Sequence, residues 1–236
     1  MDPMSIDLRP RSQLVSLRDL PVELVAAMQQ DTARLPKRER TRRQLLAAAA
    51  SVFSARGVAG ATMQEIGATA EMSTATVYNH FSTRDDVVHA LAAWLAETMC
   101  TAIATSYDHI GQAAERMSIG NRRYIWLAEE SPSWALLLLD VMDAAPEQLL
   151  RILEYPLGDL RLGLQQKSFR IASEAAAMNL IGGTVSQAMR SVALGVAPPG
   201  HGVAVATTVL RGLGVPFEKA AQTAARPLPA LRPSAG

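Results

Sequence analysis

Hydrophobic positions along the chain recur at the three- and four-residue spacing of a helix, and no stretch shows the strict alternation of a half-buried strand. Pro132 and Pro146 stand where first-turn prolines are tolerated, and glycines and further prolines break the pattern elsewhere. The pattern therefore predicts an all-α chain. From residue 84 onward it divides into helical segments over residues 84–107, 109–129, 132–143, 146–168, 170–194 and 201–213.

Residues 62–81 divide into two short helices joined by a tight turn. Thr62, with Glu65 three residues later, forms a capping-box sequence, in which hydroxyl and carboxylate satisfy free amides of the first helical turn. Ser73 is the expected N-cap of the second helix. This pair is typical of a helix-turn-helix, whose second helix enters the major groove, so double-stranded DNA is the first expected partner.

The second helix of the pair has an apolar face and a polar face. Val77 and Phe81 stand four residues apart and are predicted to face the core. Two short helices bury too little surface to be stable alone, so other helices must pack against them. Longer helices are predicted on both sides, one ending at Arg56-Gly57 and one beginning within 82–86. The outward face of the second helix then carries Thr74, Thr76, Tyr78, Asn79 and His80.

A short basic segment precedes these helices. The net charge of the whole chain is only +1, so the chain is no polycation. A solvated helix start is one interpretation of the segment, but next to a helix-turn-helix, phosphate contact or a minor-groove arm is favoured. With Glu39 as its only acid, the segment contains Arg34, Lys37, Arg38, Arg40, Arg42 and Arg43.

Over residues 40–90 the chain resembles the TetR family of bacterial transcriptional regulators. Many correctly spaced positions carry this resemblance, which makes it more specific than a helix-turn-helix pattern alone. They include Thr41-Arg42, Leu45-Leu46, Ala48-Ala49, Phe53, Gly57, Thr62, Ile66, Ser73, Val77-Tyr78, His80-Phe81 and Arg84-Asp85.

The resemblance implies a three-helix DNA-binding domain followed by a larger helical domain for ligand binding and dimerisation. Three positions depart from the family pattern, because Glu71 stands where the turn usually has glycine, Gly67 where alanine is usual and Ala75 where glycine is frequent. A left-handed backbone at Glu71 would cost about 1 kcal/mol. The DNA contacts expected from the resemblance and from the basic segment are Arg42, Thr62, Ser73, Thr74, Ala75, Thr76, Tyr78, Asn79, His80 and Arg84.

Four regions are expected along the chain. Residues 1–36 form an N-terminal extension with one helix starting at Pro21, which packs on the neighbouring domain, lies along DNA or stays partly ordered. Residues 37–84 form the DNA-binding domain and residues 85–224 the helical regulatory domain. Residues 225–236 contain three prolines and no helical period, so they are predicted to be a loose tail.

Two segments near the C-terminus, 172–194 and 203–213, are rich in small and apolar residues that let another helix approach closely. They resemble the paired helices through which TetR-like proteins form a dimeric four-helix interface. A twofold homodimer would present two recognition helices to the half-sites of a roughly palindromic operator. The expected interface residues are Met178, Gly182, Gly183, Val185, Met189 and Val209.

The resemblance also implies a pocket for a small-molecule effector among the middle helices, although side chains of these types are more often core residues than pocket residues. The same segments contain Arg116, Arg122 and Arg123, which favour an anionic ligand if one points inward and are otherwise a solvated helix face. The candidate lining consists of Tyr107, Tyr124, Trp126, Trp134 and Met142, with His109 and Met117 as further large side chains.

Other functional classes find little support in the sequence. Cys100 is the only cysteine, which excludes disulfides within the chain and cysteine-based zinc sites and leaves a core thiol or a redox sensor. No motif of a metalloprotease, a P-loop or a nucleophile elbow occurs, so we expect no enzyme, metal or cofactor. No apolar run approaches the ~18 residues that span a bilayer, which favours a cytoplasmic protein without a membrane partner. Repression follows from the resemblance alone, and activation or control by a protein partner stays open.

Overall fold

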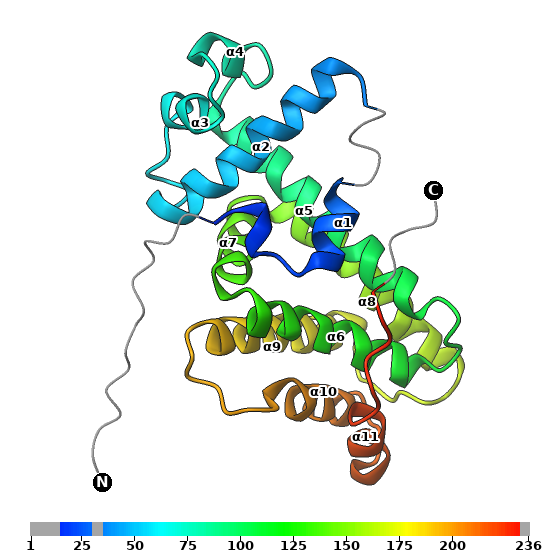
Figure 1. Cartoon of the computed structure of the whole chain (residues 1–236). Helices are drawn as coiled ribbons and strands as arrows, with labels where there is room; N and C mark the ends of the chain where they lie inside the picture. The colour runs from blue at the N-terminus through cyan, green and yellow to red at the C-terminus, as the bar shows by residue number, and fades with distance from the viewer. Residues whose placement is uncertain (1–14, 30–34, 232–236) are drawn as a thin grey trace, which may run out of the picture.

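The computed structural model describes residues 15–29 and 35–231, and within these ranges every regular element is helical, which confirms the all-α prediction (Figure 1). Arg34 of the basic segment and residues 232–236 of the predicted tail lie outside the described residues. The elements are the 3-10 turn η1 (Leu17–Asp19) and the helices α1 (Val22–Gln29), α2 (Lys37–Arg56), α3 (Met63–Thr69), α4 (Thr74–Tyr78), α5 (Arg84–Tyr107), α6 (Ala113–Glu130), α7 (Pro132–Ala144), α8 (Pro146–Gln165), α9 (Glu174–Ala193), α10 (His201–Gly212) and α11 (Phe217–Ala224).

Helices α2, α3 and α4 form a small unit at one end of the molecule, which we call the head (Figure 1). The predicted caps are present: the Thr62 hydroxyl accepts the Glu65 amide at 3.2 Å, and the Glu65 carboxylate accepts the Thr62 amide at 3.0 Å. Ser73 caps α4. Val77 and Phe81 are 0% and 2% exposed, so the predicted inward face of the second helix is confirmed.

The turn between α3 and α4 depends on two residues. Glu71 has φ 56°, so the left-handed backbone expected to cost about 1 kcal/mol is present at a non-glycine residue. Gly67 lies where the turn folds back, and a Cβ there would meet the Met72 carbonyl oxygen at 3.0 Å and Val77 Cγ2 at 3.1 Å. Glycine therefore permits the close crossing of α3 and the start of α4.

Helix α5 leaves the head and becomes the central helix of the larger helical part, α6–α11, which we call the body. It packs against α1, α2, α6, α7 and α8, so its apolar side chains are buried on several faces. The expectation that no apolar segment approaches bilayer length is wrong for α5. By length and composition alone, this helix could cross a membrane. Since 61% of the apolar stretch of α5 is buried inside the protein, its role as the core helix of a packed bundle explains its apolar composition.

The body contains two features that the sequence pattern missed. Helix α11 follows Pro216 and buries Ala220, Thr223 and Ala224, whereas the predicted segments ended at residue 213, because eight residues are shorter than the stretch over which helical periodicity is recognised. The fifth predicted segment begins later than residue 170, because Ser173 caps α9 through the Ala176 amide.

Both ends of the described chain pack against the body. On the body, Ser131 before α7 donates to the Asp19 carbonyl, and Trp134 of α7 donates to the Ser16 carbonyl. On the head, Ser51 of α2 donates to the Val15 carbonyl, so residues 15–29 bridge head and body. Of the three alternatives for the extension, packing on the neighbouring domain is the one observed for these residues.

The prediction of a loose tail is corrected for residues 225–231. Arg122 donates to the Arg226 carbonyl at 2.6 Å, Arg123 donates to the Pro229 carbonyl, and the Arg226 guanidinium pairs with Glu115. Leu231 is buried. A proline-rich segment without helical periodicity can still pack in an ordered way when guanidinium groups of a neighbouring helix bind its backbone carbonyls.

Candidate nucleic-acid interface and interior cavity

The surface of α4 and its flanks presents most of the predicted DNA contacts to solvent. Tyr78 is 54% exposed, a high value for an aromatic side chain that has no packing role in the monomer. Thr76 is half-buried, and its hydroxyl lies 2.9 Å from the Ser73 hydroxyl. Thr62, Ser73, Ala75 and Asn79 are exposed, and Thr74 and His80 are half-buried. Together they form one face with aromatic and hydroxyl groups at the end of the head, the shape that a major groove accommodates.

Arg42 and Arg84, two of the predicted DNA contacts, have partners within the protein. Arg42 Nη1 donates to the His80 carbonyl at 3.1 Å, and its guanidinium carbon lies 4.3 Å from the Phe81 ring centroid. Arg84 Nη1 donates to the Ala59 carbonyl at 2.8 Å. These arginines hold the C-terminal end of α4 and the loop before α3 in place, which orients the exposed face.

The positive charge at this end of the head comes from the first turns of α2. Lys37, Arg38 and Arg40 are exposed. Burial lowers the pKa of His80, and the positive charges of Arg38 and Arg42 lower it further. A neutral imidazole therefore stands beside these cations at neutral pH, able to donate one hydrogen bond and accept another.

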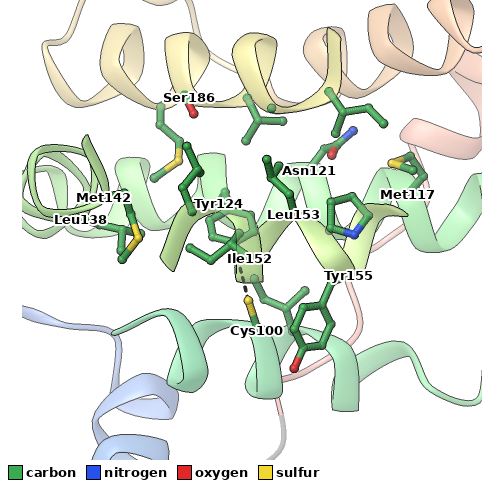
Figure 2. Close-up of a pocket in the computed structure, with 18 of the residues that line it drawn as sticks. Cys100, Met117, Asn121, Tyr124, Leu138, Met142, Ile152, Leu153, Tyr155 and Ser186 are labelled. Atoms are coloured by element: carbon green, nitrogen blue, oxygen red, sulfur yellow. Dashed lines mark hydrogen bonds between the residues drawn. The ribbon is translucent and has the colours of Figure 1, made fainter. Parts of the chain in front are cut away.

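A cavity of about 110 Å³ lies in the body between α5, α6, α7, α8 and α9. Its walls are mainly aliphatic and thioether side chains, with a few polar groups among them (Figure 2). Of the predicted lining residues, Tyr107, Tyr124, Met142 and Met117 are present in the wall. The cavity also contains residues that the sequence did not single out: Asn121, Leu153, Tyr155, Asp159 and Ser186.

Three of the predicted pocket residues lie elsewhere. Trp134 is buried under the N-terminal extension, where its indole nitrogen donates to the Ser16 carbonyl at 2.8 Å. Trp126 is half-buried, with the Arg123 guanidinium 5.0 Å from its ring centroid. His109 is exposed. The residue type indicated a pocket, but the helix face on which each side chain stands decides its location.

One corner of the cavity wall is a buried ionic cluster. Arg116 Nε donates to Asp159 Oδ1 at 2.6 Å, and the Tyr107 hydroxyl donates to Asp159 Oδ2 at 3.2 Å. Burial raises the pKa of Asp159 above its ordinary value, although the Arg116 and Tyr107 hydrogen bonds act in the opposite direction. Burial, followed by the nearby Asp159 charge, raises the pKa of Tyr107, so this phenol stays protonated.

A weaker polar contact joins α5 and α6 in the cavity wall. The Cys100 thiol of α5 lies 3.4 Å from the Tyr124 hydroxyl of α6, as the dashed line in Figure 2 shows. Burial raises the pKa of the Cys100 thiol. Since the thiolate is the reactive form of cysteine, this environment favours a core thiol over a redox sensor.

The residues predicted for a dimer interface divide between two environments. Gly182, Val185 and Met189 line the cavity, and Val209 is fully buried within the monomer. These four therefore face inward, which corrects their assignment. Met178 is half-buried and Gly183 is exposed, with nothing within 4 Å of a Cβ built on it. The exposed face of α9 consists of Ala175, Ala176, Asn179, Gly183 and Gln187, and that of α10 includes Ala204 and Thr208.

Comparison with known proteins agrees with this two-part organisation. Residues 45–91 match the sequence model of "Bacterial regulatory proteins, tetR family", and residues 112–226 match that of "Tetracyclin repressor-like, C-terminal domain". No curated protein sequence matches the chain. The first match covers most of the head with the first third of α5, and the second covers the body from α6 to α11.

Solved structures resemble the whole molecule. The regulator RolR in complex with resorcinol is 28% identical with a TM-score of 0.66, over 83% of this chain and 98% of that chain. RolR without ligand is 25% identical with a TM-score of 0.63, over 80% and 98%. The regulator FadR from Bacillus subtilis in complex with stearoyl-CoA is 18% identical with a TM-score of 0.62, over 72% and 96%, which shows the fold alone. The chain belongs to the TetR family and is a ligand-responsive DNA-binding transcriptional regulator.

Proposed function

We propose that the protein is a cytoplasmic, non-enzymatic repressor that binds a roughly palindromic operator as a homodimer and leaves it when a small molecule occupies the body cavity. The observation that carries this proposal is the course of α5. One uninterrupted helix begins at the head and ends in the cavity wall.

Contacts at both ends make α5 a mechanical link. At its start, Arg84 holds the loop before α3, and ten residues later Trp94 lies under the Arg43 guanidinium of α2, 5.6 Å from the ring centroid. Farther along, Cys100, Ile103 and Tyr107 line the cavity. From Arg84 to Cys100 the helix rises roughly 24 Å at 1.5 Å per residue. A ligand that displaces the cavity end of α5 therefore also changes the position of the head.

The ligand acts only through its preference between two arrangements of the heads. If it binds the arrangement that does not fit the operator more tightly, it lowers operator affinity by that difference in binding free energy. The RolR complex with resorcinol supports a ligand of one-ring size in a body of this kind. The stearoyl-CoA of FadR is far larger than a cavity of about 110 Å³.

The exposed face of α9, continued by that of α10, is the proposed dimer surface. Its small residues, among them Ala176, Gly183 and Ala204, allow two copies to approach closely along a four-helix interface. A twofold axis there directs two α4 helices at half-sites one helical turn or a small multiple apart. Tyr78 and its neighbours then contact base edges, while the exposed cations at the start of α2 contact phosphates.

The test is selection of bound sequences from a random duplex library with the purified protein near physiological salt. Enrichment of an inverted repeat, bound by two protomers, supports the proposal. Salt-sensitive binding without an enriched sequence contradicts an operator-specific repressor. The position of the enriched site relative to a promoter, and the effect of the protein on transcription from it, separate repression from activation.

Control by a protein partner is the second candidate, and one assay separates it from ligand control. The operator recovered by selection is bound to the protein, and small organic compounds are added one by one. Release by any of them supports ligand control. Release only on addition of a cell extract depleted of small molecules favours a protein partner.

A further inference from the structure

The cavity wall contains a buried hydrogen-bond donor that has no partner in the part of the chain that the structure describes, and this group indicates what the cavity binds. We propose that the cavity selects a neutral, one-ring-sized organic molecule bearing an oxygen acceptor, and that Asn121 is the residue that selects it by donating a hydrogen bond from Nδ2. The inference rests on the proposed role of the cavity as the effector site and names the chemical class of that effector.

Size and polarity set the first limit. The cavity of about 110 Å³ is lined largely by apolar side chains, including Leu138, Met142, Ile152 and Leu153 (Figure 2). An apolar cavity of roughly 150 Å³ accepts benzene, so a single ring with at most a small substituent matches the available space. A long acyl chain or a nucleotide does not.

Asn121 sets the second limit. It stands on α6 within the cavity wall and is only 4% exposed. Among the described residues its Nδ2 atom has no hydrogen-bond partner. A buried amide that forms no hydrogen bond costs about 1–3 kcal/mol, and a bound ligand or water that accepts the hydrogen bond removes this cost. An oxygen acceptor on the ligand satisfies this donor, and a hydrocarbon of the same shape leaves it unsatisfied.

The charges around the cavity set the third limit. Two guanidinium groups already pair with carboxylates of the wall: Arg116 Nε lies 2.6 Å from Asp159 Oδ1, and Arg190 Nη2 lies 3.5 Å from Asp143 Oδ2. Arg122 and Arg123 donate to backbone carbonyls of residues 226 and 229, away from the cavity. An anionic ligand therefore meets no unpaired guanidinium. It would instead face Asp159, and Asp143 also lines the cavity.

Three probes separate these limits in a binding experiment without DNA. Phenol offers a ring with an oxygen acceptor, toluene has the same shape without the oxygen, and benzoate adds a negative charge. Calorimetric titration of the full-length protein is expected to give at least tenfold tighter binding of phenol than of toluene, and no measurable binding of benzoate.

Variants then identify the donor. Asn121→Leu is expected to weaken phenol binding roughly ten- to hundredfold and to abolish the preference over toluene. Ser118→Ala is the matched control, because the Ser118 hydroxyl is also buried on α6 without a partner among the described residues but does not line the cavity. The Ser118→Ala variant is expected to keep the preference of the unmodified protein for phenol over toluene. Asn121→Ala provides the same comparison if the leucine variant does not fold.

The outcomes distinguish this inference from the proposed function. Phenol that binds no more tightly than toluene, or a preference that survives in both Asn121 variants, overturns the inference. Selective phenol binding that depends on Asn121 supports it, whether or not phenol releases the operator. If selective binding leaves the operator complex intact, the assigned ligand chemistry stands, and the proposed release mechanism fails.

Discussion

Replacing Arg116 by leucine is expected to destabilise the protein in a pH-dependent manner. In the native structure Arg116 Nε lies 2.6 Å from Asp159 Oδ1, and the two side chains are 24% and 5% exposed. The variant leaves the Asp159 carboxylate buried with Tyr107 as its remaining hydrogen-bond donor. Removing one member of a buried ion pair costs roughly 3–5 kcal/mol. Because Arg116 is partly solvated, we expect the lower end, about 3 kcal/mol near neutral pH.

The pH dependence follows from the carboxyl group. Burial already raises the pKa of Asp159 above its ordinary value, and loss of Arg116 raises this pKa further. The folded state then holds the Asp159 proton more tightly than the unfolded state. Stability therefore falls as pH rises from the unfolded-state pKa to the raised folded-state pKa, and the penalty in the variant is smallest below this window.

Thermal unfolding at fixed protein concentration measures the effect, since dimerisation makes the melting temperature concentration-dependent. A loss of about 3 kcal/mol corresponds to roughly 6–12 °C in a chain of this size. The double variant of Arg116→Leu with Asp159→Asn is expected to lose the added pH dependence. Arg161→Leu is the control, because its pair with Glu174 is solvent-exposed and such pairs contribute little. A drop in melting temperature for Arg116→Leu that equals the drop for Arg161→Leu, or that does not depend on pH, would refute the reasoning.

Three further substitutions test other parts of the structure. Tyr78→Ala is expected to weaken binding to the selected operator by about tenfold or more while leaving the melting temperature unchanged, because Tyr78 is 54% exposed; unchanged affinity at fixed salt contradicts its DNA contact. Gly183→Leu is expected to shift sedimentation toward monomers with the helical content retained, and intact dimers would place the interface on another face. Gly163→Ala is expected to lower stability by about 1–3 kcal/mol in chemical denaturation, because its Cβ would lie 2.0 Å from the Phe169 ring. Gly158→Ala, with nothing within 4 Å, is the matched control and is expected to raise stability slightly.

Local sequence patterns were sufficient for the head. Thr62 with Glu65 and the Ser73 cap define where α3 and α4 begin, and the spacing of Val77 and Phe81 defines which face of α4 is buried. Each of these features depends on residues within four positions of one another, so the sequence contains the whole interaction. The left-handed backbone at Glu71 was foreseen from the family resemblance, which places glycine at this position.

In the body, local sequence patterns do not determine what each apolar helix face packs against. Val185 and Met189 were expected at a dimer interface, yet they line the cavity, while Gly183 on the same helix is exposed. An apolar helix face packs equally well against a cavity, a core or a second chain. Only the positions of the neighbouring helices decide among these, and no local signal describes those positions.

Asn121 and Asp159 illustrate the same limit for polar residues. Each is a single polar side chain in an amphipathic helix, with nothing in its sequence neighbourhood to indicate burial. The partner of Asp159 stands 43 residues earlier, and the carbonyls that bind Arg122 and Arg123 lie more than 100 residues later. By itself the sequence determined most of the helices, the caps of α3 and α4 and the exposed side of α4, because short-range hydrogen bonds and periodicity control them. The tertiary structure alone decided which groups share the cavity and how the C-terminal segment docks, because those contacts join segments that are distant in the chain.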